Sequence, residues 1–425
     1  MKLYIKGGRI IDPGMQVDGI YDLLIVDKKI AGIYTCDSGP QGNREIHADG
    51  KLVFPGLVDG HTHLREPGYT HKETIRTGTM AGVRGGFTTL CCMANTNPVN
   101  DCMIVTDFIL KKAEQEGACT VYPIGAVTKG LEGSELAPIG KLKEAGCIAF
   151  SDDGMPIMNS LVFRRALEYA KNFDVPIISH CEDIQLSDGG VMNEGFISTS
   201  LGLKGVPSAS EEIMVARDMI ITDYVSGRLH LAHISTKGSV ELIRQAKQRG
   251  VKVTAETCPH YFSLTDAEAT EYRTFAKVNP PLRTTDDIAA IKEGLRDGTI
   301  DIIATDHAPH HIDDKTAEFD NSPSGISGLE TALSVGLSLV DEGVLSLNQL
   351  VDKMACKPAL IFNLSWKGTL KEGADADVVI VDTEKEFVVD TKTFLSMGKN
   401  TPFIGRKLTG RATVTISMGR VYEWE

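Results

Sequence analysis

The chain has 425 residues and a mass of 46.0 kDa, with 42% hydrophobic and 24% charged residues, so it is long enough for a large core and a smaller second unit. A formal net charge of -13 disfavours nucleic acid or an anionic membrane as the main partner, because basic patches usually bind both. The 9 cysteines include no Cys-x-x-Cys pair, the N-terminus lacks the long apolar core of a signal peptide, and no later run approaches the length of a membrane span. We therefore expect a reduced protein in the cytoplasm.

Short runs of β-branched and apolar residues fill both ends of the chain. They lie at 3–5, 9–11, 21–26, 30–34, 376–382, 387–389 and 412–416. Gly7-Gly8, Asp12-Pro13-Gly14 and Asp27-Lys28-Lys29 are expected to form turns between the first of them. Because strands this short cannot bury a core alone, we predict one small β-sandwich domain built from residues 1–54 and 366–425.

Apolar runs alternate with helical patterns in the middle of the chain. The apolar runs lie at 52–57, 88–93, 120–126, 147–150, 176–179, 229–232, 251–255 and 300–304. The helical patterns lie at 101–115, 161–171, 210–224, 239–248 and 286–295. Such alternation predicts parallel strands with right-handed crossovers, and eight units predict an α/β fold of the (β/α)8 or TIM barrel type over residues 55–365. An open doubly wound sheet would gather its polar residues at one switch point, whereas here nearly every run ends in a polar group.

A His-x-His pair, His61 and His63, follows the first apolar run. Strand side chains alternate with period two, so both imidazoles lie on one face, where they suit one metal ion such as zinc. Later runs end in His180, His233 and Asp306. A single histidine of this kind is usually a hydrogen-bonded structural residue. In a barrel, however, these five groups converge on one cavity, where burying them without a metal would be costly.

The fourth run is followed by two aspartates, Asp152 and Asp153. Adjacent aspartates often cap a helix or line a turn, but here one carboxylate can project toward the site. In the two-metal arrangement that results, Asp153 bridges the ions, with His61, His63 and Asp306 on one and His180 and His233 on the other. A centre of this kind hydrolyses amides, esters and phosphates, and the lack of a cysteine ligand favours catalytic over structural zinc.

Several segments extend this pattern beyond the metal ligands. They are His61-Thr-His-Leu-Arg-Glu-Pro-Gly68, Met93-Ala-Asn-Thr-Asn-Pro98, Phe150-Ser-Asp-Asp-Gly154, Ala304-Thr-Asp-His-Ala-Pro-His310 and Gly368-Thr-Leu-Lys-Glu-Gly-Ala-Asp-Ala-Asp-Val-Val379. Together with the strand-end histidines they resemble the bacterial type I dihydroorotases of the amidohydrolase superfamily over essentially the whole chain. His-x-His alone is shared by many amidohydrolases, whereas its continuation together with an aspartate bridge is more specific.

This resemblance implies the reversible cyclisation of N-carbamoyl-L-aspartate to (S)-dihydroorotate in pyrimidine (UMP) biosynthesis. It implies zinc, one or two ions per subunit, held by the six ligands named above. A metal-bound hydroxide would attack the ring amide carbonyl, and Asp306 would be the catalytic residue that shuttles the proton. The substrate-binding residues carried over are His63, Arg65, Asn95, Asn279, His310, Ser324 and Gly325. For Arg65 a plain salt bridge with Glu66 is the alternative.

One segment departs from the family. Pro-Phe-Gly is common after the eighth strand, where this chain has Pro323-Ser324-Gly325. A backbone contact to substrate could survive this change. The preceding stretch, 311–323, is charged and without clear period, and we predict a mobile lid.

Two other functions compete with this reading. Hydantoinases, dihydropyrimidinases and allantoinases usually bridge their metals with a carboxylated lysine, but the fourth run here ends in Ser151-Asp152-Asp153 without a lysine. Inactive dihydroorotase-like partners of aspartate carbamoyltransferase tend to lose metal ligands, and all six candidates are present. We expect an enzyme acting on a small molecule, a homodimer that can still associate with that transferase, and no binding to nucleic acid or membrane.

Overall fold

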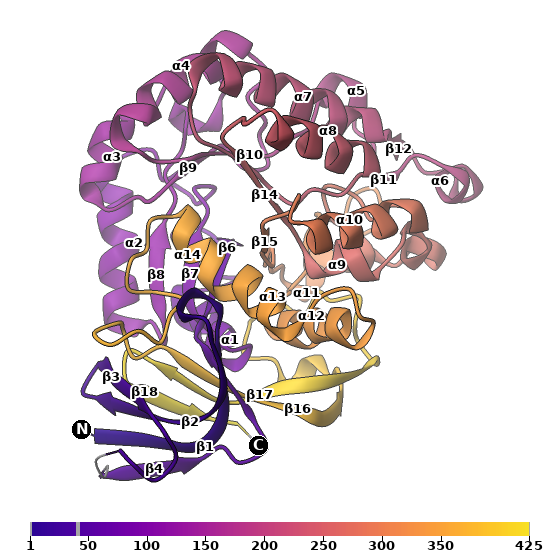
Figure 1. Ribbon diagram of the computed structural model, residues 1–425. Coiled ribbons are helices and arrows are strands. Elements are labelled where there is room, and N and C mark those ends of the chain that lie inside the picture. Colours follow the sequence, from indigo (N-terminus) through magenta and orange to yellow (C-terminus); the bar gives the residue numbers. More distant parts are fainter. Residues whose placement is uncertain (1, 40–42, 425) are drawn as a thin grey trace.

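The computed structural model describes residues 2–39 and 43–424. A barrel lies above a sheet in which both ends of the chain meet (Figure 1). The strands of this terminal sheet are β1 (Lys2–Asp12), β2 (Val17–Val26), β3 (Lys29–Tyr34), β4 (Arg44–His47), β5 (Leu52–Pro55), β16 (Val378–Val388), β17 (Lys407–Ser417) and β18 (Arg420–Glu423). They pair in the order β18-β17-β16-β5-β1-β2-β3, with β4 beside β1.

The core of the terminal sheet joins residues from both ends of the chain. Leu3, Leu23 and Ile25 pack with Val378 and Ile416, and all five are buried. The predicted small domain from both termini is therefore present as a packed unit. Its limits at 54 and 366 stay a prediction, and the first of them falls beside the last residue of β5.

Eight parallel strands form the barrel. They are β6 (Leu57–Thr62), β7 (Phe87–Cys92), β8 (Thr120–Pro123), β9 (Phe150–Ser151), β10 (Ile177–Ser179), β13 (Leu229–Leu231), β14 (Val253–Thr257) and β15 (Ile302–Ile303). Bridges between Gly125 and Phe150 and between Thr62 and His307 close the ring where the ladders stop. This arrangement confirms the predicted barrel.

Helices surround the strands and lie mainly on the outside of the barrel (Figure 1). They are α1 (Ile75–Arg84), α2 (Met103–Glu116), α3 (Ile139–Ala145), α4 (Ser160–Ala170), α5 (Ile184–Ser187), α6 (Phe196–Leu201), α7 (Ser208–Val225), α8 (Lys237–Gln248), α9 (Pro259–Ser263), α10 (Thr285–Asp297), α11 (Ile312–Lys315), α12 (Ala332–Asp341), α13 (Leu347–Val351) and α14 (Lys357–Ile361). A short pair, β11 (Met192–Asn193) and β12 (Gly205–Val206), flanks α6. Among the described residues, no helix is both long enough and apolar enough to span a membrane.

Two details of the predicted strands are wrong. The run 52–57 is not the first barrel strand, because Leu52–Pro55 forms β5 and pairs with β1 and β16 in the terminal sheet. The barrel strand begins at Leu57, so His61 lies within β6 and not after it. Gly7-Gly8 is not a turn either. The register of β1 against β2 shifts between Ile5 and Gly8, so the pair forms a bulge inside one long strand.

Candidate metal centre and substrate cavity

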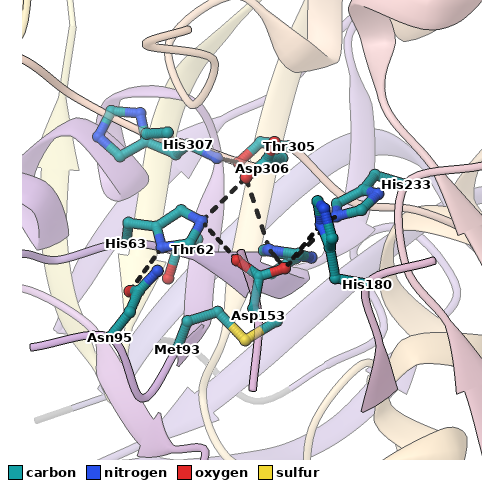
Figure 2. A network of polar contacts seen from close by, with 12 residues as sticks. Thr62, His63, Met93, Asn95, Asp153, His180, His233, Thr305, Asp306 and His307 are labelled. Carbon is teal, nitrogen blue, oxygen red and sulfur yellow. Dashed lines mark hydrogen bonds and ion pairs between the residues drawn. The ribbon is translucent and has the colours of Figure 1, made fainter. Parts of the chain in front are cut away.

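All six predicted metal ligands lie at the carboxyl ends of barrel strands and are buried. They are His61, His63, Asp153, His180, His233 and Asp306. Strands β6, β9, β10, β13 and β15 supply them, and the close-up shows the labelled members of the set pointing toward one another (Figure 2). The neighbouring His307 points elsewhere, and its Nε2 lies 3.3 Å from Glu73. The structure thus brings together every side chain that the sequence placed in the cluster.

Asp153 occupies the middle of the cluster (Figure 2). Its Oδ1 lies 3.4 Å from His61 Nε2, 3.4 Å from His233 Nε2 and 3.7 Å from His180 Nδ1. Its Oδ2 lies 3.5 Å from His63 Nε2. One carboxylate therefore faces all four imidazoles with both of its oxygens, which is the geometry that a bridging ligand needs.

Two groups of atoms within the cluster are close enough to share an ion. Ligand atoms of His61, His63 and Asp306 lie within 4.8 Å of one another, and so do those of His61, Asp153 and His233. His180 Nδ1 lies 2.9 Å from His233 Nε2. Zinc–nitrogen bonds of roughly 2 Å place tetrahedral ligand atoms on the order of 3 Å apart, so such a pair can share one ion.

The electrostatics of the cluster fit a cation. His61 Nε2 is buried without a hydrogen-bond partner, although it faces two carboxylates. Burial acts to lower the pKa of His61, but Asp153 and Glu256 outweigh it and hold that pKa well above its ordinary value. Burial likewise opposes the effect of Asp153 and Glu182 on His180, whose pKa rises to about 10. Because this field favours positive charge, a divalent ion is well matched to the site.

Three of the four histidines are oriented by a partner behind them. His61 Nδ1 lies 2.6 Å from Glu256 Oε1, His180 Nε2 lies 3.0 Å from Glu182 Oε2, and His63 Nδ1 lies 2.9 Å from Asn95 Oδ1. In each case the ring nitrogen on the far side donates to the oxygen, so the other nitrogen is free to face the cluster.

Glu256 connects two strands behind the cluster. Its second oxygen lies 3.0 Å from His230 Nε2, and the His230 ring in turn meets Thr254 through Nδ1 at 2.8 Å. Glu256 and His230 are both fully buried. The histidines that Glu256 accepts from lower its pKa against the opposing effect of burial, so the carboxylate stays ionised behind His61.

A cavity of about 270 Å³ opens beside the cluster. It is lined by His63, Arg65, Asn95, Asp153, Gly154, His180, His233, Val278, Asn279, Asp306, Ala308, His310, Ser324 and Gly325. Every predicted substrate-binding residue is in this set, and of the predicted metal ligands only His61 is missing from it. The cluster and the predicted substrate residues therefore face one space.

Arg65 lies against the loop after β15. Its Nε lies 3.3 Å from the carbonyl oxygen of Pro309, and its Nη2 lies 3.4 Å from His310 Nε2. Among the described residues no carboxylate lies within ion-pair distance of its guanidinium. Glu66 Oε2 instead accepts from the backbone N–H of Ile75 at 2.9 Å. The alternative of a salt bridge between Arg65 and Glu66 is therefore wrong. The cation is thus available to an anion in the cavity.

His310 is held in its neutral form. Burial lowers its pKa first, and the nearby cations Arg65, Lys72 and Lys315 lower it further, to about 2. Its Nε2 donates to the backbone oxygen of Ser324 at 2.9 Å. The backbone of Ser324 therefore contributes to the wall of the cavity although its side chain differs from the family pattern.

Asn279 donates from its amide nitrogen to Glu182 Oε2 at 2.8 Å, which ties the cavity wall to the residue that orients His180.

The segment 311–323, the predicted lid, contains α11 and is packed through Lys315 and Phe319, both of which are buried. Lys277 Nζ donates to the carbonyl oxygen of Phe319 at 2.7 Å. The mobility of the segment 311–323 stays a prediction.

Sequence reasoning assigned no role to three residues that hold this arrangement together: Glu182, Glu256 and Asn400. Glu256 ends a predicted strand run and Glu182 follows His180 by two positions, so their places were visible although their hydrogen bonds were not. Asn400 lies far along the chain in the connection between β16 and β17, and nothing in its local pattern points to the cavity.

The chain is similar to known proteins of one family over nearly its whole length. Residues 50–239 match the family described as Dihydro-orotase-like. A dihydroorotase of Syntrophus aciditrophicus is 54% identical over 99% of this chain and 99% of its own length. One from Acetivibrio thermocellus is 54% identical over 99% of this chain and 98% of its own length.

Solved structures share the fold. An L-hydantoinase (dihydropyrimidinase) from Arthrobacter aurescens superposes with a TM-score of 0.89 at 28% identity and covers 99% of this chain and 95% of its own. A D-hydantoinase (dihydropyrimidinase) from Thermus sp. gives 0.82 at 27% identity, over 99% of this chain and 94% of its own. These neighbours share the barrel, while the two relatives at 54% identity share the name dihydroorotase. The chain belongs to the dihydroorotase family of cyclic amide hydrolases.

Proposed function

We propose that this chain catalyses the reversible cyclisation of N-carbamoyl-L-aspartate to (S)-dihydroorotate in pyrimidine biosynthesis. One observation carries the proposal: five of the six metal-type ligands line the same cavity as Arg65, which forms an ion pair with no carboxylate among the described residues. The cluster supplies hydrolytic chemistry, and the arginine supplies recognition of an anionic ring. The names of the most similar relatives support the same reaction.

The metal of this proposal is zinc, as one or two ions per subunit. His61, His63 and Asp306 would hold one ion, His180 and His233 the other, and Asp153 would bridge them. Bound zinc supplies an activated water and polarises the carbonyl that is attacked. The absence of thiolate ligands and the buried imidazole and carboxylate donors support zinc in a catalytic role.

Asp306 is the proposed proton carrier. Its Oδ1 lies 3.0 Å from His63 Nε2 and 3.5 Å from His61 Nε2, and its side chain lines the cavity. Burial acts to raise its pKa, but the imidazoles of His61 and His63 outweigh this and lower it. An ionised carboxylate in this place can take the proton of the attacking water and pass it to the leaving ring nitrogen.

The opposite wall binds the substrate carboxylate in this proposal. Arg65 offers its planar fork, and Asn95 offers amide N–H donors, because its oxygen already accepts from His63. His310, Ser324 and Gly325 complete the wall, and Asn279, which also lines the cavity, would bind the ring. His63 belongs to both the metal cluster and the cavity.

The test follows the loss of dihydroorotate absorbance with purified, zinc-loaded protein at alkaline pH. We expect ring opening with dihydroorotate and little with hydantoin or dihydrouracil, which lack the carboxylate, and we expect no turnover by Asp306→Ala. Equal or better turnover of hydantoin would contradict the proposal and favour the chemistry named for the structural neighbours.

The cellular setting is part of the proposal. All nine cysteines lie in the described residues and are free thiols, which supports the reducing cytoplasm. We also propose that the protein is a homodimer and that it associates with aspartate carbamoyltransferase. Light scattering of the protein alone and mixed with the transferase tests both. A monomer that does not bind the transferase would contradict them.

A further inference from the structure

A connection within the terminal sheet contacts the loops that line the substrate cavity. It is the connection between β16 and β17, residues 389–406. Leu395 and Ser396 in it donate backbone N–H groups to Glu330 at 2.9 and 3.2 Å, and Met397 donates to Glu73 at 3.2 Å. The carboxylates of Glu330 and Glu73 therefore fix this segment to the barrel a few residues before Asn400.

Asn400 is 1% exposed, and its amide is hydrogen-bonded on both atoms. Its Oδ1 accepts from the backbone N–H of His310 at 2.9 Å and from Ser327 Oγ at 2.9 Å. Its Nδ2 donates to the carbonyl oxygens of Ala308 at 3.0 Å and Gly325 at 2.8 Å. One side chain therefore uses both donors and both acceptor positions on two loops.

These two loops form the carboxylate side of the cavity. Ala308 and His310 come from the loop after β15, and Gly325 from the segment beyond the predicted lid, and all three line the cavity. Gly325 has φ of +146°, and a Cβ there would lie 2.6 Å from the Ala308 carbonyl oxygen. The loops thus meet closely, and Asn400 bonds to the backbone of each at this junction.

The neighbouring backbone strengthens the contact. Ser327 N donates to the carbonyl oxygen of Asn400 at 2.8 Å. Gly398 packs so closely that a Cβ there would lie 2.4 Å from Pro309 Cβ. Pro309 in turn accepts from Arg65 Nε at 3.3 Å. A shift of the 398–400 segment would therefore move both His310 and the carbonyl that Arg65 contacts.

We propose that Asn400 is a positioning residue through which the terminal β domain sets the affinity for the substrate carboxylate. This inference rests on the proposed function, because it concerns the residues assigned to that carboxylate. Asn400 touches neither the metal cluster nor the reacting atoms. Its loss should therefore weaken substrate binding while the metal content and the chemical step are kept.

The experiment measures kcat, KM for dihydroorotate and bound zinc for the wild type and three variants. Asn400→Ala removes all four side-chain hydrogen bonds. Gly398→Ala keeps Asn400 but presses on Pro309, so it tests the same contact if the first variant is poorly folded. Asn193→Ala is the matched control, since Asn193 is a buried amide that bonds to Asp266 and Arg283, neither of which lines the cavity.

We expect KM to rise by about tenfold or more in Asn400→Ala and Gly398→Ala, with kcat within about threefold of wild type and zinc content unchanged. Asn193→Ala should keep the wild-type KM even if its melting temperature falls. A lower melting temperature with unchanged KM in both test variants would show that Asn400 only stabilises the fold, and loss of zinc would place its effect on the metal cluster; either result overturns the inference. An inactive wild type would instead contradict the proposed function itself.

Discussion

The two walls of the cavity are built in different ways. The metal wall takes His63, Asp153, His180, His233 and Asp306 from the ends of five strands, each residue fixed by its own place in the barrel. The carboxylate wall takes its residues from loops that are held by backbone hydrogen bonds and by a side chain from the terminal domain. In the proposed function, chemistry is therefore carried by strand ends of the barrel, whereas recognition of the substrate depends on contacts between distant segments.

This contrast predicts that changes on the metal wall alter kcat or metal affinity, and that changes on the carboxylate wall alter KM. The largest effect should come from Asp306→Asn. The amide keeps the shape of the carboxylate but cannot carry the proton, so we expect kcat to fall by roughly 10³ to 10⁴. Steady-state kinetics at matched zinc content checks this. A loss of less than about tenfold would remove Asp306 from its proposed role.

A change on the other wall should leave the chemistry intact. Arg65→Lys keeps the charge but loses the planar fork, so we expect KM for dihydroorotate to rise by on the order of 100-fold with zinc content unchanged. Isothermal titration with a carboxylate-bearing product analogue gives an independent readout of the same loss. If kcat fell while KM stayed constant, the two walls would not be separable in the way described.

Glu256→Gln tests the hydrogen bonds that support His61 in the metal cluster. A neutral amide holds His61 less firmly and cannot accept from both His61 and His230 as the carboxylate does. We expect zinc affinity to fall by about 10- to 100-fold. Competition with a chromophoric chelator measures this, with Glu268→Gln as the control because Glu268 pairs with Arg273 and Arg406 away from the cluster. Equal affinities of the two variants would contradict the role given to Glu256.

The last prediction concerns the pH dependence of stability near the carboxylate wall, and it leaves catalysis aside. Burial, together with Lys277, lowers the pKa of Lys315 to about 7. An unfolded lysine titrates near pH 10.4, so between about pH 7 and 10 the unfolded state binds more protons, and stability rises with pH by at most about 1.4 kcal/mol per unit.

Lys315→Met should remove this contribution to the rise in the free energy of unfolding between about pH 7 and 10. Below about pH 7 the difference between wild type and variant should not change with pH. Urea unfolding of wild type and variant at a series of pH values measures the difference. Parallel curves over the whole range would show that Lys315 does not titrate in this window.

The same contrast explains what the sequence could predict. His61, His180 and Asp306 each lie at the end of a strand whose apolar pattern is local, so barrel geometry alone brings them together. Asn400 meets His310 and Gly325 across 90 and 75 positions, through backbone groups that leave no trace in residue type. The prediction for Leu52–Pro55 is wrong for a related reason. Its apolar pattern suits either the barrel or the terminal sheet, and only its pairing with β16 places it in the terminal sheet.

The most direct test of the central claim is turnover of dihydroorotate by metal-free protein during stepwise addition of zinc. We expect no ring opening without metal, and a rate that rises with added zinc and levels off by two equivalents per chain. Full turnover by the metal-free protein, or a rate that zinc does not change, would contradict it.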